Sequence, residues 1–176
     1  IAAQNAGAQL IVMHGRSRAC RFKGEAQPER LREARQHIQV PLLVNGDVID
    51  SRSASRAMSA SGADGVMIGR GAMGQPWIFA QLLGQPLPNL AERLDVIGRH
   101  LQMMHEFYGD EAGARIARKH MQAYLQRWGA AELTPSFMPL IDGAAQRQWL
   151  CTHRESLLGI AQSVAAQVGA QTPFAA

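Results

Sequence analysis

Two short apolar runs, each followed at once by a glycine-containing turn, decide the fold: PLLVNGDVID at residues 41–50 and GADGVMIGRG at residues 62–71. A third run of the same kind, LIVMHGR, occupies residues 10–16. None of the three alternates polar with apolar residues, and this is typical of strands covered on both faces of a parallel sheet. We therefore predict parallel strands over residues 10–13, 41–44 and 66–68.

The segments between these runs fit the crossover helices of βα units. The stretch PERLREARQHI at residues 28–38 places three apolar residues on one helical face: Leu31, Ala34 and Ile38. Asp50 or Ser51 can cap a second helix, which Gly62 ends. The spacing between the runs leaves room for a strand, a helix and two loops in each unit. The sequence therefore predicts repeated βα units.

The pattern changes after Gly71. A short helix over residues 76–83 leads into the proline-containing linker GQPLPN at residues 84–89, and no strand-like run follows it. Helical periodicity continues from there to near the end of the chain. On this basis we predict a βα part over residues 1–85 and an all-helical part over residues 86–176.

The second part carries several helix signals. Asn89 and Glu92 have the spacing of a capping box, and a further helix is expected to begin after Gly109. The apolar face of that helix consists of Ala117, His120, Met121, Tyr124, Leu125 and Trp128, with His120 at its border. Thr134 can begin another helix, and the last helix is predicted over residues 150–168.

The composition is that of a globular protein, with 176 residues of which 47% are hydrophobic and 18% charged. No apolar run is long enough to span a membrane, and no basic leader precedes an apolar segment. We therefore expect a cytoplasmic protein without a membrane partner. Because the chain begins with Ile1 in what resembles the end of a helix, we expect it to be the C-terminal piece of a longer protein.

The net charge and the two cysteines indicate which partners and which metal or disulfide sites to expect. The net charge of +4 suits a polyanionic partner without requiring one. Cys20 and Cys151 lie far apart and outside any CxxC or Cys/His spacing, so the sequence predicts neither a disulfide framework nor a metal site. We expect both cysteines to be structural.

Polar residues and glycines follow each predicted strand, as His14-Gly15-Arg16, Asn45-Gly46-Asp47 and Gly69-Arg70-Gly71. The carboxyl ends of parallel strands share one rim, where ligands bind. Glycines let an anion approach the backbone closely, and the guanidinium of Arg70 offers a forked donor to a phosphate. The three ends together predict a site for a phosphorylated cofactor. Singly, each glycine turn fits a structural turn equally well, and His14 alone fits a hydrogen-bonded core histidine.

Basic residues form a second candidate site on the helix after Gly109. Arg115, Arg118 and Lys119 are spaced i, i+3 and i+4, so they project from one side of the helix and can meet successive phosphates of a nucleic acid. A solvated charged face is the other interpretation of the same pattern.

Four segments resemble the flavin-dependent tRNA-dihydrouridine synthases, most closely their bacterial B-type branch. They are MHGRSRACRFKGEA (13–26), PLLVNGDVID (41–50), GADGVMIGRGAMGQPWIF (62–79) and ARIARKH (114–120), and the likeness runs from residue 1 to about residue 128. The resemblance implies an α/β chain that is the C-terminal part of a (β/α)8 TIM barrel, with strands six to eight of that barrel, followed by an all-helical domain that binds tRNA.

The resemblance also implies roles for single residues. The FMN phosphate and ribityl chain would be held by Asn45, Gly46, Asp47, Gly69 and Arg70, and His14 would lie beside the flavin. The tRNA would be contacted by Arg16, Arg18, Arg115, Arg118, Lys119 and His120. No metal and no protein partner are implied.

In this family, NADPH reduces FMN, the flavin passes a hydride to a tRNA uridine, and a cysteine supplies the proton that completes 5,6-dihydrouridine. That cysteine belongs to the preceding half of the barrel, so neither Cys20 nor Cys151 takes its place, and Lys23 is not the family's lysine near the flavin. Because three strands cannot close a barrel, we expect no turnover from residues 1–176 alone.

Two other functions fit part of the sequence. Another FMN or sugar-phosphate barrel enzyme would explain the NGD and GRG turns, but not the basic HGRSR loop or the ARIARKH helix. A truncated, non-catalytic RNA-binding piece would explain the basic residues without a flavin. The residues upstream of Ile1 test the catalytic hypothesis: if they lack the family's cysteine and lysine, the catalytic hypothesis fails and the binding hypotheses stand.

Overall fold

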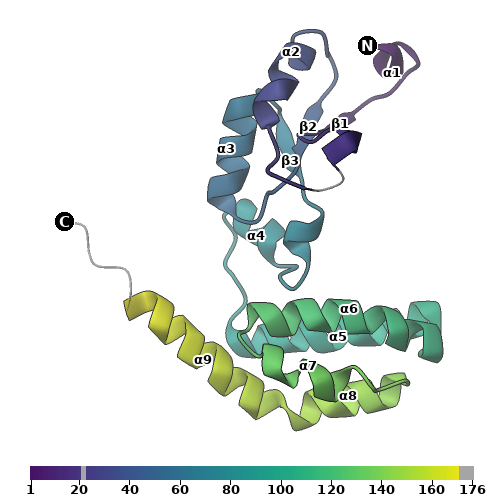
Figure 1. Cartoon of the computed structure of the whole chain (residues 1–176), viewed down its shortest axis with the longest axis vertical. Helices are drawn as coiled ribbons and strands as arrows, with labels where there is room; N and C mark the ends of the chain where they lie inside the picture. The colour runs from purple at the N-terminus through teal and green to yellow at the C-terminus, as the bar shows by residue number, and fades with distance from the viewer. Residues whose placement is uncertain (21–22, 171–176) are drawn as a thin grey trace. The chain divides into compact units, whose positions relative to one another are not determined.

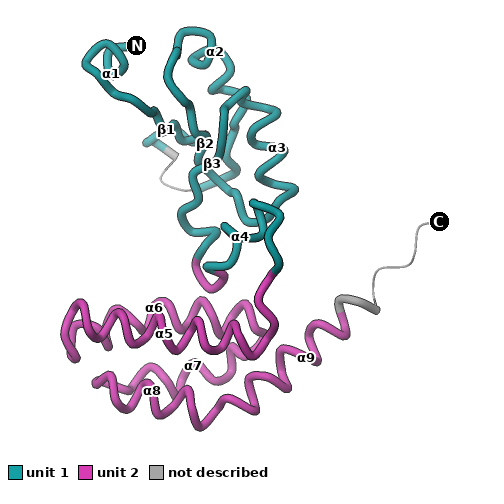
Figure 2. The backbone as a smooth tube through the Cα atoms, turned by 180° about the vertical axis from the view of Figure 1, so that it is seen from behind, with its two compact units in different colours: residues 1–72, 76–86 teal, residues 73–75, 87–176 magenta. Residues whose placement is uncertain are grey.

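The chain folds into two compact units, which a computed structural model describes over residues 1–20 and 23–170 (Figures 1 and 2). The first unit comprises Ile1–Ala72 and Pro76–Pro86, and the second comprises Met73–Gln75 and Leu87–Ala176. The sequence places the boundary between residues 85 and 86, one residue before the main division of the structure.

The first unit is built on a three-stranded parallel sheet in the order β1-β2-β3. Its strands are β1 (Ile11–His14), β2 (Leu42–Asn45) and β3 (Gly65–Met67). The three predicted strands are therefore confirmed, each displaced by about one residue. For β2 the reason is Pro41, which has no N–H to give to the ladder, although its carbonyl accepts the Ile11 N–H at 2.9 Å.

The helices of the first unit are α1 (Ala2–Asn5), α2 (Leu31–Arg35), α3 (Ser51–Ser61) and α4 (Ile78–Leu82). Short 3-10 turns at Arg18–Cys20, Pro28–Arg30 and Arg70–Ala72 complete it. The predicted caps of α3 are confirmed: Asp50 forms a reciprocal capping box with Ser53, and Gly62 ends the helix at a φ of 72°. Both crossovers are thus helical, as the βα pattern predicts.

The hydrophobic core of this unit lies between the sheet and helices α2 and α3. It contains Leu31, Ile38, Leu42, Val44, Val48, Ala54, Ala57 and Ala63. The opposite face of the sheet is open in the described chain, since Val12 is 46% exposed and Met67 is 42% exposed. The expectation of strands covered on both faces is therefore wrong for this chain. In a barrel, the face away from the helices is the one turned to the interior.

The second unit contains helices only among its described residues. They are α5 (Leu90–Tyr108), α6 (Asp110–Arg127), α7 (Thr134–Phe137), α8 (Gly143–Thr152) and α9 (Arg154–Ala170), with a 3-10 turn at Ala131–Leu133. The capping box of Asn89 and Glu92 is confirmed. Helices α5 and α6 pack closely, because a Cβ on Gly113 would lie 2.7 Å from the Met104 carbonyl oxygen.

The last helix, predicted over residues 150–168, is α9, but it begins at Arg154 rather than Leu150, because α8 continues to Thr152 and the two helices meet at His153. The imidazole of His153 stacks on Trp149 with ring centroids 4.1 Å apart, and its Nδ1 lies 2.8 Å from the Trp149 carbonyl oxygen. Arg154 begins the next helix and pairs with Asp95 at 2.9 Å. None of the described helices combines the length and the apolar character that a bilayer span requires.

Two histidines and a tyrosine lie together between α5 and α6. The Nδ1 of His100 is 3.0 Å from the Tyr124 hydroxyl, and the rings of His100 and His120 are 4.9 Å apart. Burial, and then the nearby His120, lowers the pKa of His100. Burial, and then the charge of Lys119, lowers the pKa of His120. Burial raises the pKa of Tyr124 to about 12.

This cluster predicts a loss of stability in mild acid. Since the pKa of His100 is lower in the folded protein, the unfolded chain binds more protons as the pH falls through about 6.5, the ordinary histidine pKa, and folding weakens there. We expect the urea midpoint of the wild type to fall between pH 7.5 and pH 5.5 by more than that of the His100→Gln variant. Equal falls in the two proteins would contradict this role of His100.

Candidate functional site: a pocket at the strand ends

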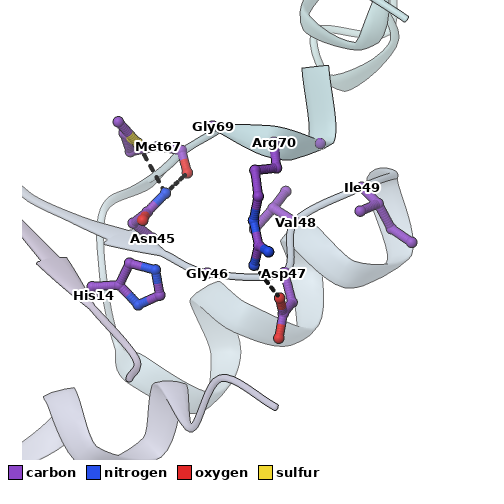
Figure 3. A pocket seen from close by; sticks show the side chains of 10 residues that line it. His14, Asn45, Gly46, Asp47, Val48, Ile49, Met67, Gly69 and Arg70 are labelled. Atoms are coloured by element: carbon purple, nitrogen blue, oxygen red, sulfur yellow. Dashed lines mark hydrogen bonds and ion pairs between the residues drawn. The ribbon is translucent and has the colours of Figure 1, made fainter. Parts of the chain in front are cut away.

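A row of three side chains crosses the open face of the sheet at its carboxyl end. Asn45 is paired in register with His14 on β1 and with Met67 on β3. The Asn45 amide donates to the Met67 carbonyl oxygen at 2.7 Å and lies 2.9 Å from the Met67 sulfur (Figure 3). The parallel register thus brings together residues that are far apart in the sequence, and it fixes the orientation of the Asn45 amide.

His14 is fixed by its neighbours on both sides. Its Nδ1 accepts the backbone N–H of Arg16 at 3.0 Å, which leaves Nε2 as the ring nitrogen that can donate. A Cβ on Gly46 would lie 3.2 Å from the His14 Cε1, so the turn after β2 packs tightly against the ring. His14 therefore presents a ring of one tautomer at the edge of the pocket.

The turn after β2 has an uncommon backbone. Gly46 has a φ of 126° and Asp47 a φ of 54°, the latter in the left-handed region that side chains rarely adopt. A Cβ on Gly46 would also lie 2.7 Å from the Cβ of Ala26. Such a conformation persists only where the surrounding contacts hold it.

Those contacts are made by the Asp47 carboxylate. One of its oxygens accepts a hydrogen bond from the Arg16 guanidinium at 2.5 Å and another from the Ala26 backbone N–H at 2.8 Å. The other oxygen lies 3.8 Å from the guanidinium of Arg70. Burial raises the pKa of Asp47, but these hydrogen bonds and the charges of both arginines outweigh it and hold the pKa below its ordinary value. Asp47 is therefore an anion that bridges two cations.

The turn after β3 contributes Gly69, Arg70 and Gly71. The side chain of Arg70 is 62% exposed and reaches toward Asp47 (Figure 3). Gly71 is needed for packing, because a Cβ there would lie 1.9 Å from the Val48 carbonyl oxygen. Gly69, by contrast, has no atom within 4 Å of a Cβ position, so it leaves open space beside the turn.

The two turns and the end of β1 enclose a pocket of about 290 Å³. All six predicted cofactor-binding residues line it: His14, Asn45, Gly46, Asp47, Gly69 and Arg70. The open backbone at Gly69 and the exposed guanidinium of Arg70 fit a phosphate group, which takes backbone donors and a forked cation. No group of three or more metal-ligating side chains occurs among residues 1–20 and 23–170.

The predicted RNA-contacting residues of the first unit differ in exposure. Arg18 is exposed, whereas only 6% of the Arg16 side chain is exposed. The Nε and Nη2 of Arg16 donate to the Gly24 carbonyl oxygen at 3.1 and 2.7 Å, and Nη2 also donates to the Asp47 carboxylate. The structure thus turns the Arg16 guanidinium inward rather than toward a partner, because a carboxylate and a carbonyl meet it there.

The basic residues of α6 also differ in exposure. Arg115, which lies 3.8 Å from Glu111, and Lys119 are both exposed. Arg118 donates to the Leu140 carbonyl oxygen at 3.2 Å, and His120 is half-buried against His100. The helical spacing predicts one basic face, but Arg118 bonds the chain after α6 and His120 packs against His100 of α5.

Sequence reasoning missed several residues of the pocket. Met67 and Ile49 line it, and Gly24 and Ala26 supply backbone groups that hold Arg16 and Asp47. The strand register that pairs Asn45 with Met67 could have indicated Met67. Gly24 and Ala26 carry no such signal, because their contribution is made by the main chain. Cys151 is exposed with a free thiol, and the side chain of Cys20 lies outside the described part of the chain.

Parallel βα units with a pocket at the carboxyl ends of the strands make this an α/β protein, a class in which ligands commonly bind at the strand ends. The family model described as "Dihydrouridine synthase (Dus)" matches residues 1–150, and the chain belongs to this family. The family resemblance of its motifs is thereby confirmed.

Curated relatives support the same family. The chain is 37% identical over 164 residues to "tRNA-dihydrouridine synthase B" of Proteus vulgaris, a match that covers 89% of this chain and 51% of the relative. It is 42% identical over 132 residues to the protein of the same name in Escherichia coli (strain K12), with 70% of this chain and 41% of the relative covered. The chain thus spans about half the length of the curated relatives it matches.

Proposed function

We propose that the chain is the C-terminal part of an FMN-dependent tRNA-dihydrouridine synthase, an enzyme that reduces a tRNA uridine to 5,6-dihydrouridine with NADPH. In this proposal β1, β2 and β3 are the last three strands of a (β/α)8 barrel, and the helical unit binds tRNA. The sequential strand order and the helices packed on one face of the sheet support a barrel over a doubly wound sheet. The enzyme would act in the cytoplasm.

One observation carries the proposal: residues from three strand ends line a single pocket that fits a phosphate. Arg70 and the backbone around Gly46 and Gly69 would hold the phosphate of FMN. His14, with its Nε2 proton, would face the flavin from the end of β1. A sugar-phosphate enzyme would use the same turns, but the match to the dihydrouridine synthase family extends to residue 150, well beyond the sheet.

The residues of this chain would bind FMN and orient the uridine, and FMN, when bound, would supply the hydride of the reaction. The uridine would leave its base stack to reach the open face of the sheet. The His14 ring and the Asn45 amide, both oriented by hydrogen bonds to their neighbours, would provide the polar groups next to the uridine. The cysteine that gives the proton would come from the other half of the barrel.

The activity is tested with the full-length gene product. We expect it to purify with FMN and to oxidise more than one NADPH per flavin only when tRNA without dihydrouridine is added, with dihydrouridine appearing in the tRNA. A flavoprotein that leaves such tRNA unmodified would favour another FMN barrel enzyme. A protein that binds tRNA but no flavin would favour the RNA-binding piece.

For tRNA, we propose that the exposed cations Arg18, Arg115 and Lys119 meet its phosphates directly. Arg118 and His120 would contribute from the less exposed side of α6, and Arg16 would act from within its loop. The exposed positions of Arg115 and Lys119, one helical turn apart, support the first of these roles.

Replacing Arg115 and Lys119 together by Ala is expected to weaken tRNA binding by about 10-fold at low salt. The slope of log K against log salt should fall by about two, since each lost phosphate contact removes about one released counterion. Filter binding of tRNA at several salt concentrations measures both. The control is Arg56→Ala, which removes an exposed charge from α3. A double variant with an unchanged salt slope would show a merely solvated face.

A further inference from the structure

Arg16 is the most deeply placed charge near the pocket. Only 6% of its side chain is exposed, and its contacts are the Asp47 carboxylate and the Gly24 carbonyl. Its Nη1 is buried without a hydrogen-bond partner among the described residues. A buried donor left unpaired is unfavourable, so the other contacts of the guanidinium are what hold it in this position.

Asp47 needs this neighbour. Its carboxylate lines the pocket and is 36% exposed, in the space where an anionic phosphate is expected. Two like charges a few ångströms apart repel strongly unless a cation lies between or beside them. The other nearby cation, Arg70, lies 3.8 Å from the carboxylate and is the residue expected to turn to the phosphate. Of the two described arginines whose charges lower the pKa of Asp47, Arg16 is the one left to offset the carboxylate while Arg70 binds the ligand.

Arg16 also connects the pocket to the loop after β1. Its side chain joins Gly24 in that loop to Asp47 in the turn after β2, while its backbone N–H fixes the Nδ1 of His14. The Gly15 N–H donates to the Asn45 carbonyl oxygen at 2.9 Å, which fastens the same two segments. One residue thereby fixes two of the side chains that line the pocket.

We propose that Arg16 is a positioning residue of the phosphate site: it neutralises Asp47 and holds the left-handed turn, so that the carboxylate does not repel the phosphate bound by Arg70. The inference rests on the proposed flavin function and adds a residue that the resemblance assigns to RNA. Its distinguishing consequence is selectivity for the phosphate, because the phosphate is the part of FMN whose negative charge Asp47 would repel.

The test compares the binding of FMN and of riboflavin, which lacks the phosphate, to the full-length apoprotein by quenching of flavin fluorescence. In Arg16→Met, the ratio of FMN affinity to riboflavin affinity should fall by about 10-fold, the effect of one unscreened charge at this range. In Arg16→Met/Asp47→Asn the ratio should return to within about threefold of the wild type, since the repelling charge is gone. Arg16→Lys, which keeps the charge, should retain most of the ratio.

The matched control is Arg35→Met. Arg35 makes the same kind of fork, to the Asp64 carboxylate at 3.2 Å and to the Ile38 carbonyl oxygen at 2.8 Å, at the other end of the sheet. The Arg35→Met variant should have the same ratio of FMN affinity to riboflavin affinity as the wild type. A lower ratio would show that the effect comes from general loosening of the first unit and would contradict the inference.

Other outcomes are equally decisive. A wild type that binds riboflavin as tightly as FMN would overturn the proposed phosphate site itself. A wild type that prefers FMN, with an Arg16→Met variant of unchanged preference, would overturn only the role of Arg16. If Arg16→Met does not fold, the double variant decides: its failure to fold would show that the fold, rather than Asp47, requires Arg16.

Discussion

Replacing Arg70 by Ala is expected to lower the affinity of the full-length protein for FMN by about 10- to 100-fold. The estimate corresponds to one charged hydrogen-bonding group, about 1.5–3 kcal/mol. The affinity for riboflavin should change by less than about twofold, because the lost contact is to the phosphate. Fluorescence titration of the apoprotein with each flavin gives both values.

Stability separates this effect from damage to the fold. Because 62% of the Arg70 side chain is exposed, its loss should change the free energy of unfolding by no more than about 0.5 kcal/mol. A variant that retains FMN as tightly as the wild type would contradict the phosphate role. A variant that loses FMN and riboflavin equally would show that Arg70 supports the pocket rather than the phosphate.

Replacing Gly71 by Ala is expected to have the opposite profile, with a large loss of stability. The new Cβ would lie 1.9 Å from the Val48 carbonyl oxygen, so the backbone of one turn has to move. Overpacking of this kind costs about 1–3 kcal/mol, and contact with a main-chain atom puts the effect at the upper end. Since Val48 follows Asp47 directly, FMN and riboflavin should both bind more weakly. Urea denaturation and flavin titration measure the two losses.

The neighbouring glycine provides the control for stability. At Gly69 no atom lies within 4 Å of a Cβ position, so Gly69→Ala should leave the free energy of unfolding within about 1 kcal/mol of the wild type. Gly69→Ala can still change FMN affinity, because the new methyl group would enter the pocket. Equal destabilisation by the two substitutions would contradict the close packing of Gly71 against Val48.

Much of the fold could be predicted because its signals are local. The Asp50 and Asn89 caps and the Gly62 stop each depend on residues within a few positions of one another, and all three are confirmed. The break at His153 could not be predicted, since it depends on the stacking of His153 on Trp149 and on the ion pair of Arg154 with Asp95. The helical periodicity on both sides of His153 gives no sign of it.

The candidate site shows the same division. The residues after each strand could be named from the sequence, because parallel strands bring their carboxyl ends to one edge. The inward position of Arg16 could not, since it depends on the Gly24 carbonyl and on the left-handed backbone at Asp47. The spacing of the basic residues on α6 likewise could not predict the hydrogen bond from Arg118 to the Leu140 carbonyl oxygen, because Leu140 lies outside the helix.

The central claim is that the turns at residues 45–47 and 69–71 together hold the phosphate of FMN. The most direct test is a crystal structure of the full-length protein with FMN bound. The account predicts the phosphate between these two turns, against the guanidinium of Arg70, with Asp47 still paired to Arg16. A phosphate bound elsewhere, with Arg70 pointing into solvent, would contradict it.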